Sequence, residues 1–409
     1  MKASAVPFGV LFGILALCGC GSDGGGGGQG GTGSGGGTET GEDPSGDGSA
    51  SAGGTVGGGS TSAGEGPGNG ATAGDASSGG TSGGVEGQTL SERYPGDVGM
   101  ADDPAVLFFD DFEQGWGAWD WPDADTEHLF LTTDAATANG GSRFLRSTVT
   151  GDQLLQDQYI SSSTKATFPE RTDTMYFRFY ARFVGIAPNP HHWVRIAAGN
   201  DTYDSSGLAN TVPPGDQGFW FDFDISNDDV FNFYVYWYLM RSGWCNDGST
   251  TPGCDGQQGG DPYFYGNVFR PPAQTPFVRD TWVCIEMMGQ ANTVGSSDGA
   301  LAFWVDDQLA DRYEPGHPIG TWLRETFHTG GCEFSACTEP QPFEGFDFRS
   351  SAEVGFKSIF LDAYYERGSF ENKRAALEAQ GLTVSDVQTI EYDDVVVANE
   401  RIGCKVPLE

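Results

Sequence analysis

Arginine, histidine and tyrosine side chains recur between residues 176 and 238, and together they could act on a sugar acid. β-Elimination needs a cation that neutralises the uronate carboxylate, a base for the neighbouring proton and an acid for the leaving oxygen. Arg178, Arg182 or Arg195 could neutralise the carboxylate, and His191 or His192 could be the base. Tyr234, Tyr236 or Tyr238 could be base or acid where a neighbouring arginine lowers the tyrosine pKa. A proline-flanked loop and ordinary strand packing are the alternative interpretations of the histidines and tyrosines.

Residues 176–183 alternate between apolar and polar side chains. Successive side chains of a strand point to opposite faces, so the phenylalanines predict a core face and the tyrosines and arginines an outer face. That outer face is either ordinary solvated surface or the floor of a groove for an anionic, hydroxyl-rich polymer. We expect it to share one concave sheet with the polar faces near residues 193–195 and 234–238. The predicted substrate-binding residues are Tyr176, Arg178, Tyr180, Arg182, Trp193, Trp220 and Tyr238.

Asp222 and Asp224 lie two positions apart in an alternating stretch and so on one face of a strand. Hydrolysis of a glycosidic bond uses two carboxyl groups, which are about 5 Å apart when configuration is retained. The pair therefore suggests a glycoside hydrolase as one alternative. Solvated or calcium-binding aspartates are the other interpretation.

Acidic residues also cluster in the first and last predicted strands. Calcium prefers several hard oxygen ligands in loose geometry, so these strands would form a structural calcium site if they pair. Acidic strand edges that discourage aggregation are the alternative. The predicted ligands are Asp110, Asp111, Glu113, Asp393 and Asp394.

The N-terminus has the features of an export signal. Lys2 is followed by an apolar stretch, residues 6–17, that is too short to span a bilayer as a mature helix. It ends in Leu-Cys-Gly-Cys, which resembles a bacterial lipobox and implies that Cys20 becomes a lipidated N-terminus. An ordinary secretory signal is the alternative. We therefore expect a signal peptide at residues 1–19 and a protein of the cell envelope, lipid-anchored at the outer membrane or cell surface.

Residues 20–99 are predicted to form a tether, because glycine, serine and threonine dominate and little apolar surface could offset the ordering entropy. Residues 100–409 are predicted to form one domain with a substantial core. With 57 acidic and 21 basic residues, the chain is a poor partner for nucleic acid. We expect a monomer that meets the membrane only through its anchor and binds an acidic or neutral polysaccharide.

Six cysteines lie beyond Cys20, and an even number in an exported protein indicates disulfides. Cys245 with Cys254 and Cys332 with Cys337 are close enough in sequence to close loops. Cys284 with Cys404 would then join two strands. Fifteen pairings are formally possible, so this set is a preference.

The domain has strand after strand with period-two alternation, as in residues 219–225 and 231–240, and one helical stretch at 370–380. Asp306 and Asp307 are predicted to form a hairpin turn. This pattern predicts an all-β fold, a sandwich or jelly roll of two antiparallel sheets.

Three motifs resemble concanavalin-A-like jelly rolls: residues 108–113 (FFDDFE), 300–309 (ALAFWVDDQL) and 391–398 (EYDDVVVA). Within that group the chain is most similar to polysaccharide lyases that cut glucuronan or alginate. The resemblance spans about residues 107–404. It implies binding of an acidic polysaccharide and its cleavage by β-elimination. Together with the lipobox-like ending at Cys20, this leads us to expect a surface lipoprotein. A non-catalytic carbohydrate-binding or adhesion lipoprotein is the alternative, since many proteins of this layout are binding modules.

Overall fold

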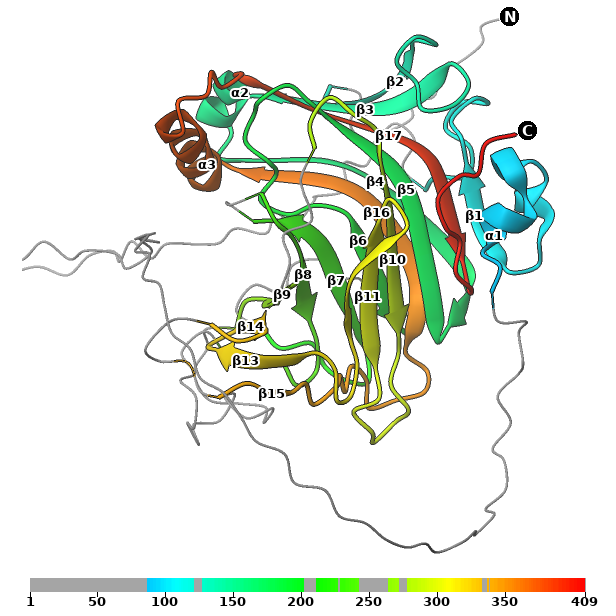
Figure 1. The fold of residues 1–409 in the computed structure, drawn as a ribbon, viewed down its shortest axis with the longest axis vertical. Coiled ribbons are helices and arrows are strands. Elements are labelled where there is room, and N and C mark those ends of the chain that lie inside the picture. The colour runs from blue at the N-terminus through cyan, green and yellow to red at the C-terminus, as the bar shows by residue number, and fades with distance from the viewer. Residues whose placement is uncertain are drawn as a thin grey trace, which may run out of the picture. The chain divides into compact units, whose positions relative to one another are not determined.

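The computed structural model describes residues 87–120, 127–201, 211–226, 229–242, 264–271, 278–332, 337 and 339–408. Strands dominate this part of the chain, and they form two large sheets (Figure 1). The prediction of an all-β sandwich is confirmed. The signal peptide, Cys20, most of the predicted tether and the Cys245–Cys254 pair lie outside the described residues. None of the described helices is both long and apolar enough to cross a membrane.

The first sheet, sheet A, brings the two ends of the domain together. Its strand order is β12 (Gln308–Tyr313), β11 (Ala300–Val305), β10 (Val283–Gln290), β5 (Thr174–Val184), β17 (Val387–Ala398), β3 (Arg143–Thr150) and β2 (Leu129–Thr133). The first strand, β1 (Val106–Asp110), pairs antiparallel with the last strand, β17, as the resemblance to jelly rolls implies. Asp306 and Asp307 have positive φ angles of 49° and 62° and form the predicted turn between β11 and β12.

The second sheet, sheet B, holds the strands from the middle of the sequence. Its order is β15 (Gln341–Pro342), β13 (Ile319–Leu323), β14 (Thr326–Thr329), β9 (Asn267–Arg270), β8 (Phe231–Tyr236), β7 (Gly218–Ile225), β6 (Arg195–Gly199), β16 (Gly355–Glu366) and β4 (Tyr159–Thr172). Neighbouring strands run antiparallel except β14 and β9, which are parallel.

The core lies between the two sheets and is rich in phenylalanine. Phe303 of sheet A packs edge-on against Phe223 and Phe233 of sheet B, with ring centroids 4.9 and 5.3 Å apart. Phe177 and Phe179 of β5 are fully buried in the same cluster, as the alternation predicts. Each such side chain contributes about 1.5–3 kcal/mol by leaving water, so the apolar faces fix which side of each sheet faces outward.

Three α-helices flank the sheets in the described residues: α1 (Leu90–Arg93), α2 (Gly151–Gln156) and α3 (Arg367–Ala379). The predicted helix at 370–380 corresponds to α3. It begins three residues earlier because the Glu366 carboxylate accepts the backbone N–H bonds of Gly368 and Ser369. Residues 87–99 were expected in the tether. They contain α1, whose Leu90 is buried and whose N-cap Thr89 forms a capping box with Glu92.

Two of the predicted disulfides fall within the described residues, and both are formed. Cys284 and Cys404 join β10 to the C-terminal segment, with Cα atoms 5.9 Å apart. Cys332 and Cys337 close a short loop with Cα atoms 6.0 Å apart.

Candidate functional site

The polar face of β5 lies beneath the two ends of the described chain. The Arg178 guanidinium is fully buried, and its Nη2 donates to the Asp97 carboxylate at 2.7 Å and to the Asp394 carbonyl at 3.2 Å. Asp97 belongs to η1 (Pro95–Asp97), just after α1. Tyr176 is half-buried, with its ring centroid 6.2 Å from that of Trp304. This face is therefore covered by protein.

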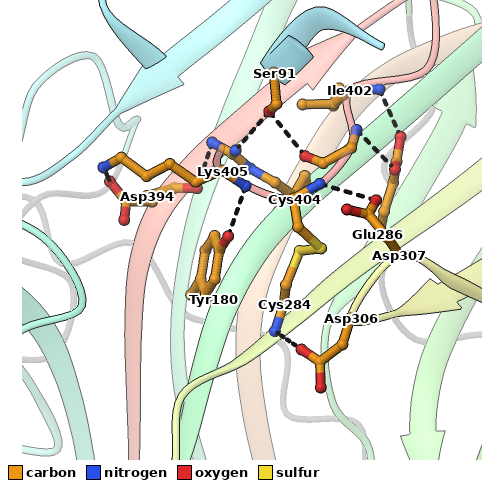
Figure 2. Close-up of a disulfide and its surroundings, with 12 residues drawn as sticks. Ser91, Tyr180, Cys284, Glu286, Asp306, Asp307, Asp394, Ile402, Cys404 and Lys405 are labelled. Carbon is orange, nitrogen blue, oxygen red and sulfur yellow. Dashed lines mark hydrogen bonds and ion pairs between the residues drawn. A yellow bond between two sulfur atoms is a disulfide. The ribbon is translucent and has the colours of Figure 1, made fainter. Parts of the chain in front are cut away.

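Figure 2 shows how the C-terminal segment is held on the same face. Its disulfide joins Cys404 to Cys284 of β10. The buried Glu286 carboxylate accepts the backbone N–H bonds of Ile402 at 2.7 Å and Gly403 at 3.0 Å. Covalent and charge-assisted bonds together attach the segment to sheet A.

Tyr180 and Arg182 also have protein partners. The Tyr180 hydroxyl accepts the backbone N–H of Lys405 at 2.7 Å, and burial raises the Tyr180 pKa to about 12. Arg182 donates to the Glu391 carboxylate, which also pairs with Arg146. The prediction that this face shares a groove with the tyrosines of β8 is wrong. β5 belongs to sheet A and β8 to sheet B, so the two polar faces point away from each other across the core.

The outer face of sheet B carries the other set of predicted residues. The alternation of β7 holds, with Phe219, Phe221 and Phe223 in the core and Trp220, Asp222 and Asp224 on the opposite face. In β8 the pattern places Tyr234 and Tyr236 on that outer face. Arg195 begins β6 directly opposite Asp222. The structure therefore brings three of the predicted polar strand faces together.

Six aromatic rings form a continuous row across this outer face, which we call the ring row. Neighbouring ring centroids are 4.5 Å apart for Trp220 and Tyr236, 5.6 Å for Tyr236 and Tyr234, and 4.6 Å for Tyr234 and His192. The row continues at 5.9 Å from His192 to Tyr364 and at 6.1 Å from Tyr364 to Tyr159. Trp220 and Tyr236 are buried, whereas the other four rings are partly exposed and suit the stacking of sugar rings. The members are Trp220, Tyr236, Tyr234, His192, Tyr364 and Tyr159.

His192 in the middle of the row is oriented by a buried carboxylate. Its Nδ1 lies 2.8 Å from one Asp224 oxygen, and the other Asp224 oxygen accepts the Trp193 backbone N–H at 2.7 Å. Burial lowers the pKa of His192 to about 4 and raises the pKa of Asp224 to about 6. At pH 7 the imidazole is therefore neutral and the carboxylate ionised. An ionised carboxylate only accepts, so Nδ1 bears the proton and Nε2 is the basic nitrogen.

Arg195 is held beside the row by a two-point ion pair. Its Nε and Nη2 donate to the two oxygens of Asp222, the second at 3.0 Å. The guanidinium lies 5.5 Å from the Trp220 ring, and its side chain keeps 17% exposure. Asp362 of β16 is a further carboxyl on this face, and burial raises its pKa to about 7. At neutral pH much of Asp362 is uncharged, which reduces the negative charge of the face.

Tyr234 lies next to His192 in the ring row and holds its hydroxyl proton tightly. Burial raises its pKa well above the usual value of 10, and the neighbouring Tyr236 raises it further. The ring is confined by Gly266, where an added Cβ would lie 2.6 Å from the Tyr234 ring. Its hydroxyl therefore keeps its proton at neutral pH. The expectation that an arginine lowers this pKa is not met, because Arg195 pairs with Asp222.

Three further predicted site residues are not members of the ring row. Trp193 was expected on the sugar-binding face, but it is fully buried in the core, and its indole N–H donates to the Tyr392 hydroxyl at 2.7 Å. It precedes β6, so the strand alternation does not extend to it. Tyr238 lies beyond the end of β8 and is not in the ring row. His191 is exposed, with its ring 4.3 Å from that of His192.

One group of histidine and acidic side chains in the described residues is close enough to share a metal ion. His192, Asp222 and Asp224 each place one ligand atom within 4.8 Å of the others. Both oxygens of Asp222 accept bonds from Arg195, and those of Asp224 face His192 and the Trp193 N–H. We therefore interpret the group as an oriented dyad beside an ion pair.

The predicted calcium ligands do not form such a group among the described residues. Asp110 accepts the Trp119 indole N–H at 2.7 Å. Asp393 accepts backbone N–H bonds, and Asp394 pairs with Lys405 at 2.8 Å. Calcium stays a prediction for the five acids named from the sequence, which are Asp110, Asp111, Glu113, Asp393 and Asp394.

Sequence reasoning missed Tyr159, Tyr364 and Asp362. The last two lie two positions apart in β16, opposite core residues such as Leu361 and Ala363. The alternation in this strand was visible, but the sequence does not show that β16 pairs with β6 and so places them beside the predicted residues.

No protein-family model matches the chain, and no curated protein matches it. Solved structures similar to it include an endo-β-1,4-glucuronan lyase from the fungus Trichoderma reesei, at 10% identity and a TM-score of 0.37, covering 72% of this chain and 96% of that one. The alginate lyase vAL-1 from Chlorella virus has 11% identity and a TM-score of 0.42, covering 72% and 100%. The Emp47p carbohydrate recognition domain has 10% identity and a TM-score of 0.29, covering 68% and 90%. Polysaccharide lyases and carbohydrate-binding proteins are thus among the structures similar to this chain.

Proposed function

We propose that the outer face of sheet B binds an acidic polysaccharide and cleaves it by β-elimination. The observation that carries the proposal is the His192–Asp224 dyad in the ring row, with Tyr234 and Arg195 next to it. These groups match the base, acid and cation that the reaction needs.

His192 is the proposed base. Its Nε2 takes the proton on the carbon next to the uronate carboxyl group, while Asp224 holds Nδ1–H and stabilises the imidazolium that forms. The electron pair of the broken C–H bond forms a carbon–carbon double bond and expels the glycosidic oxygen. A neutral imidazole at neutral pH is the state that this step requires.

Tyr234 is the proposed acid and Arg195 the proposed carboxylate partner. The Tyr234 hydroxyl is protonated at neutral pH and can pass its proton to the leaving oxygen. Arg195 lies beside the ring row, 5.5 Å from the Trp220 ring, and its planar guanidinium suits a carboxylate. Proton transfer from His192 back to Tyr234 would restore both groups.

Binding without cleavage is the second candidate. The charge of Arg195 is balanced by Asp222, so less of it is available to stabilise a developing enediolate. The ring row would bind sugars in either case. Glycoside hydrolysis is less favoured, because Asp222 and Asp224 are buried and accept hydrogen bonds from protein groups.

The same proposal includes an exported lipoprotein of the cell envelope. Support comes from the lipobox-like sequence at Cys20 and from the disulfides, which are typical of oxidising compartments. A lipid anchor would keep the domain at a surface where polysaccharides occur. Lipidation of Cys20 can be tested with Cys20→Ser, which should release the protein from the membrane fraction or block its processing.

The test of the activity is incubation of the purified protein with uronic-acid polymers such as polyglucuronate and alginate. Elimination creates an unsaturated sugar that absorbs in the ultraviolet. We expect His192→Asn to reduce the rate of product formation by about 10²–10⁴-fold, the range for loss of a general base. His191→Asn is the matched control, because His191 is an exposed neighbouring histidine outside the dyad, and it should retain most of the activity.

Three outcomes separate the candidates. Unsaturated product that depends on His192 supports the lyase. Polymer binding with no product for any uronate supports the binding module. Equal loss in the two histidine variants would contradict the assigned roles.

A further inference from the structure

Lys373 is a buried cation that the proposed reaction does not use. It lies in α3, where it is buried together with Phe370 and Leu377. A lysine is seldom this buried without partners, because removing an ammonium group from water is costly. The hydrogen-bond partners of Lys373 therefore indicate its role.

The Lys373 ammonium bonds backbone carbonyls. Nζ lies 2.6 Å from the Pro190 carbonyl oxygen, which is the close contact, and 3.4 and 3.5 Å from the carbonyl oxygens of Ile225 and Asn189. No carboxylate of the described residues is bonded to this ammonium, so its three donors link backbone segments.

These segments are the two that carry the dyad. Pro190 lies two residues before His192, and Ile225 follows Asp224 directly. Lys373 thus bonds the chain on both sides of the 2.8 Å contact between the imidazole and the carboxylate. A link at this place fixes the separation of the two segments.

Beyond His192 the two segments are joined directly, since the Trp193 N–H donates to Asp224 and the Phe223 N–H to the Val194 carbonyl, each at 2.7 Å. Before His192, other bonds hold the histidine segment without reaching Ile225. The backbone N–H groups of His191 and His192 donate to the Tyr364 carbonyl at 2.6 and 3.2 Å. The Asn189 amide donates to Asp229 at 2.6 Å. Neither contact includes the residue next to Asp224.

We infer that Lys373 is a positioning residue that sets the geometry of the His192–Asp224 dyad by bonding the backbone on both sides of it. Its catalytic consequence rests on the proposed function, whereas its effect on the dyad does not. Loss of the three donors would let the histidine segment move relative to β7, so that Nδ1–H no longer stays on the carboxylate. Substrate contacts elsewhere in the ring row would be unaffected.

The first readout is independent of activity. In the full-length protein labelled with ¹⁵N-histidine, the His192 imidazole should give the signals of one neutral tautomer with a slowly exchanging Nδ1–H, assigned by its absence in His192→Asn. Lys373→Met should abolish this Nδ1–H signal or mix the tautomers. Lys373→Arg, which keeps charge and donors, should restore at least part of it.

The second readout is kinetic. Lys373→Met should lower kcat at least tenfold with KM within twofold. Leu377→Ala is the matched control, since it removes apolar packing from the buried side of the same helix; it should lower Tm with kcat within twofold. If Lys373→Met does not fold, Lys373→Gln, which keeps an amide donor, replaces it in both measurements.

An unchanged His192 signal in a folded Lys373 variant would overturn the inference. So would a fall in kcat that Leu377→Ala reproduces at equal loss of Tm. If the wild-type protein forms no unsaturated product, the proposed function fails, and the imidazole signal alone decides the role of Lys373.

Discussion

The two outer faces of this sandwich each present an arginine, a carboxylate and tyrosines, but they differ in what lies over them. Arg178 on sheet A is fully buried and pairs with Asp97, which belongs to the N-terminal segment. Arg195 on sheet B pairs with Asp222 of the adjacent strand and keeps 17% side-chain exposure. The first pair joins distant parts of the chain, and the second lies within one sheet.

This difference shows how similar residue patterns acquire different roles. On sheet A the arginine serves to attach the chain ends, and Tyr180 is bonded to the C-terminal backbone. On sheet B the arginine adjoins a partly exposed histidine in the ring row. An alternating Tyr–Arg strand therefore predicts an outward face, while the partners of its side chains decide the role of that face, since Arg182 of sheet A is as exposed as Arg195, at 17%.

The largest expected effect comes from removing the disulfide that holds the C-terminal segment on sheet A. Replacing both Cys284 and Cys404 by alanine opens a link with a sequence separation of 120. The chain-entropy relation gives about 4–5 kcal/mol of lost stability as an upper figure. Denaturant unfolding would measure it. Removal of Cys332 and Cys337, separated by 5 residues, should cost only about 2 kcal/mol by the same relation. Equal losses would contradict a special role for the C-terminal attachment.

Breaking the buried ion pair is expected to have the next largest effect. Arg178→Ala leaves Asp97 buried without its main partner and should cost about 3–5 kcal/mol of stability. Polymer binding by the folded fraction should not change, in contrast to what the groove prediction required. Arg182→Ala is the control and should cost less, because Glu391 keeps Arg146 as a partner. Weaker polymer binding with an unchanged free energy of unfolding would instead support the predicted groove on sheet A.

Asp362 on sheet B is expected to give a smaller, pH-dependent effect. Burial raises its pKa to about 7, so the folded protein retains a proton that the unfolded chain loses above about pH 4. Its contribution to stability is thus present below pH 4 and lost as pH rises through 7. The free energy of unfolding of Asp362→Asn, relative to that of wild type, should rise by on the order of 2–4 kcal/mol between pH 4 and pH 8. Unfolding curves at both pH values would show it; a constant difference would contradict the raised pKa.

Much of the fold could be predicted from the sequence because the alternation of apolar and polar residues lies within each single strand. Residues 219–225 show which side chains face the core, and Asp306 and Asp307 form the expected turn. The pairing of the first and last strands followed from the family resemblance. The disulfide between Cys284 and Cys404 was a preference that the structure confirms.

The site could be predicted only in part, since sheet membership depends on contacts between distant residues. β5 pairs with β10 and β17, more than a hundred residues later, and nothing within residues 176–183 indicates that. The outward residues of β5 and β8 were therefore placed together wrongly. Trp193 was misplaced because the strand begins only at Arg195. The role of Asp224 depends on a segment 32 residues away in the chain.

The most direct test compares one tyrosine on each face. Tyr234→Phe and Tyr180→Phe each remove a single hydroxyl, from the ring row and from the covered face of sheet A. With a uronic-acid polymer as substrate, our account predicts that Tyr234→Phe lowers formation of unsaturated product by about 10²-fold or more, the lower end for loss of a general acid. Tyr180→Phe should retain the rate. Retained activity in Tyr234→Phe together with loss in Tyr180→Phe would contradict the assignment of the site to sheet B.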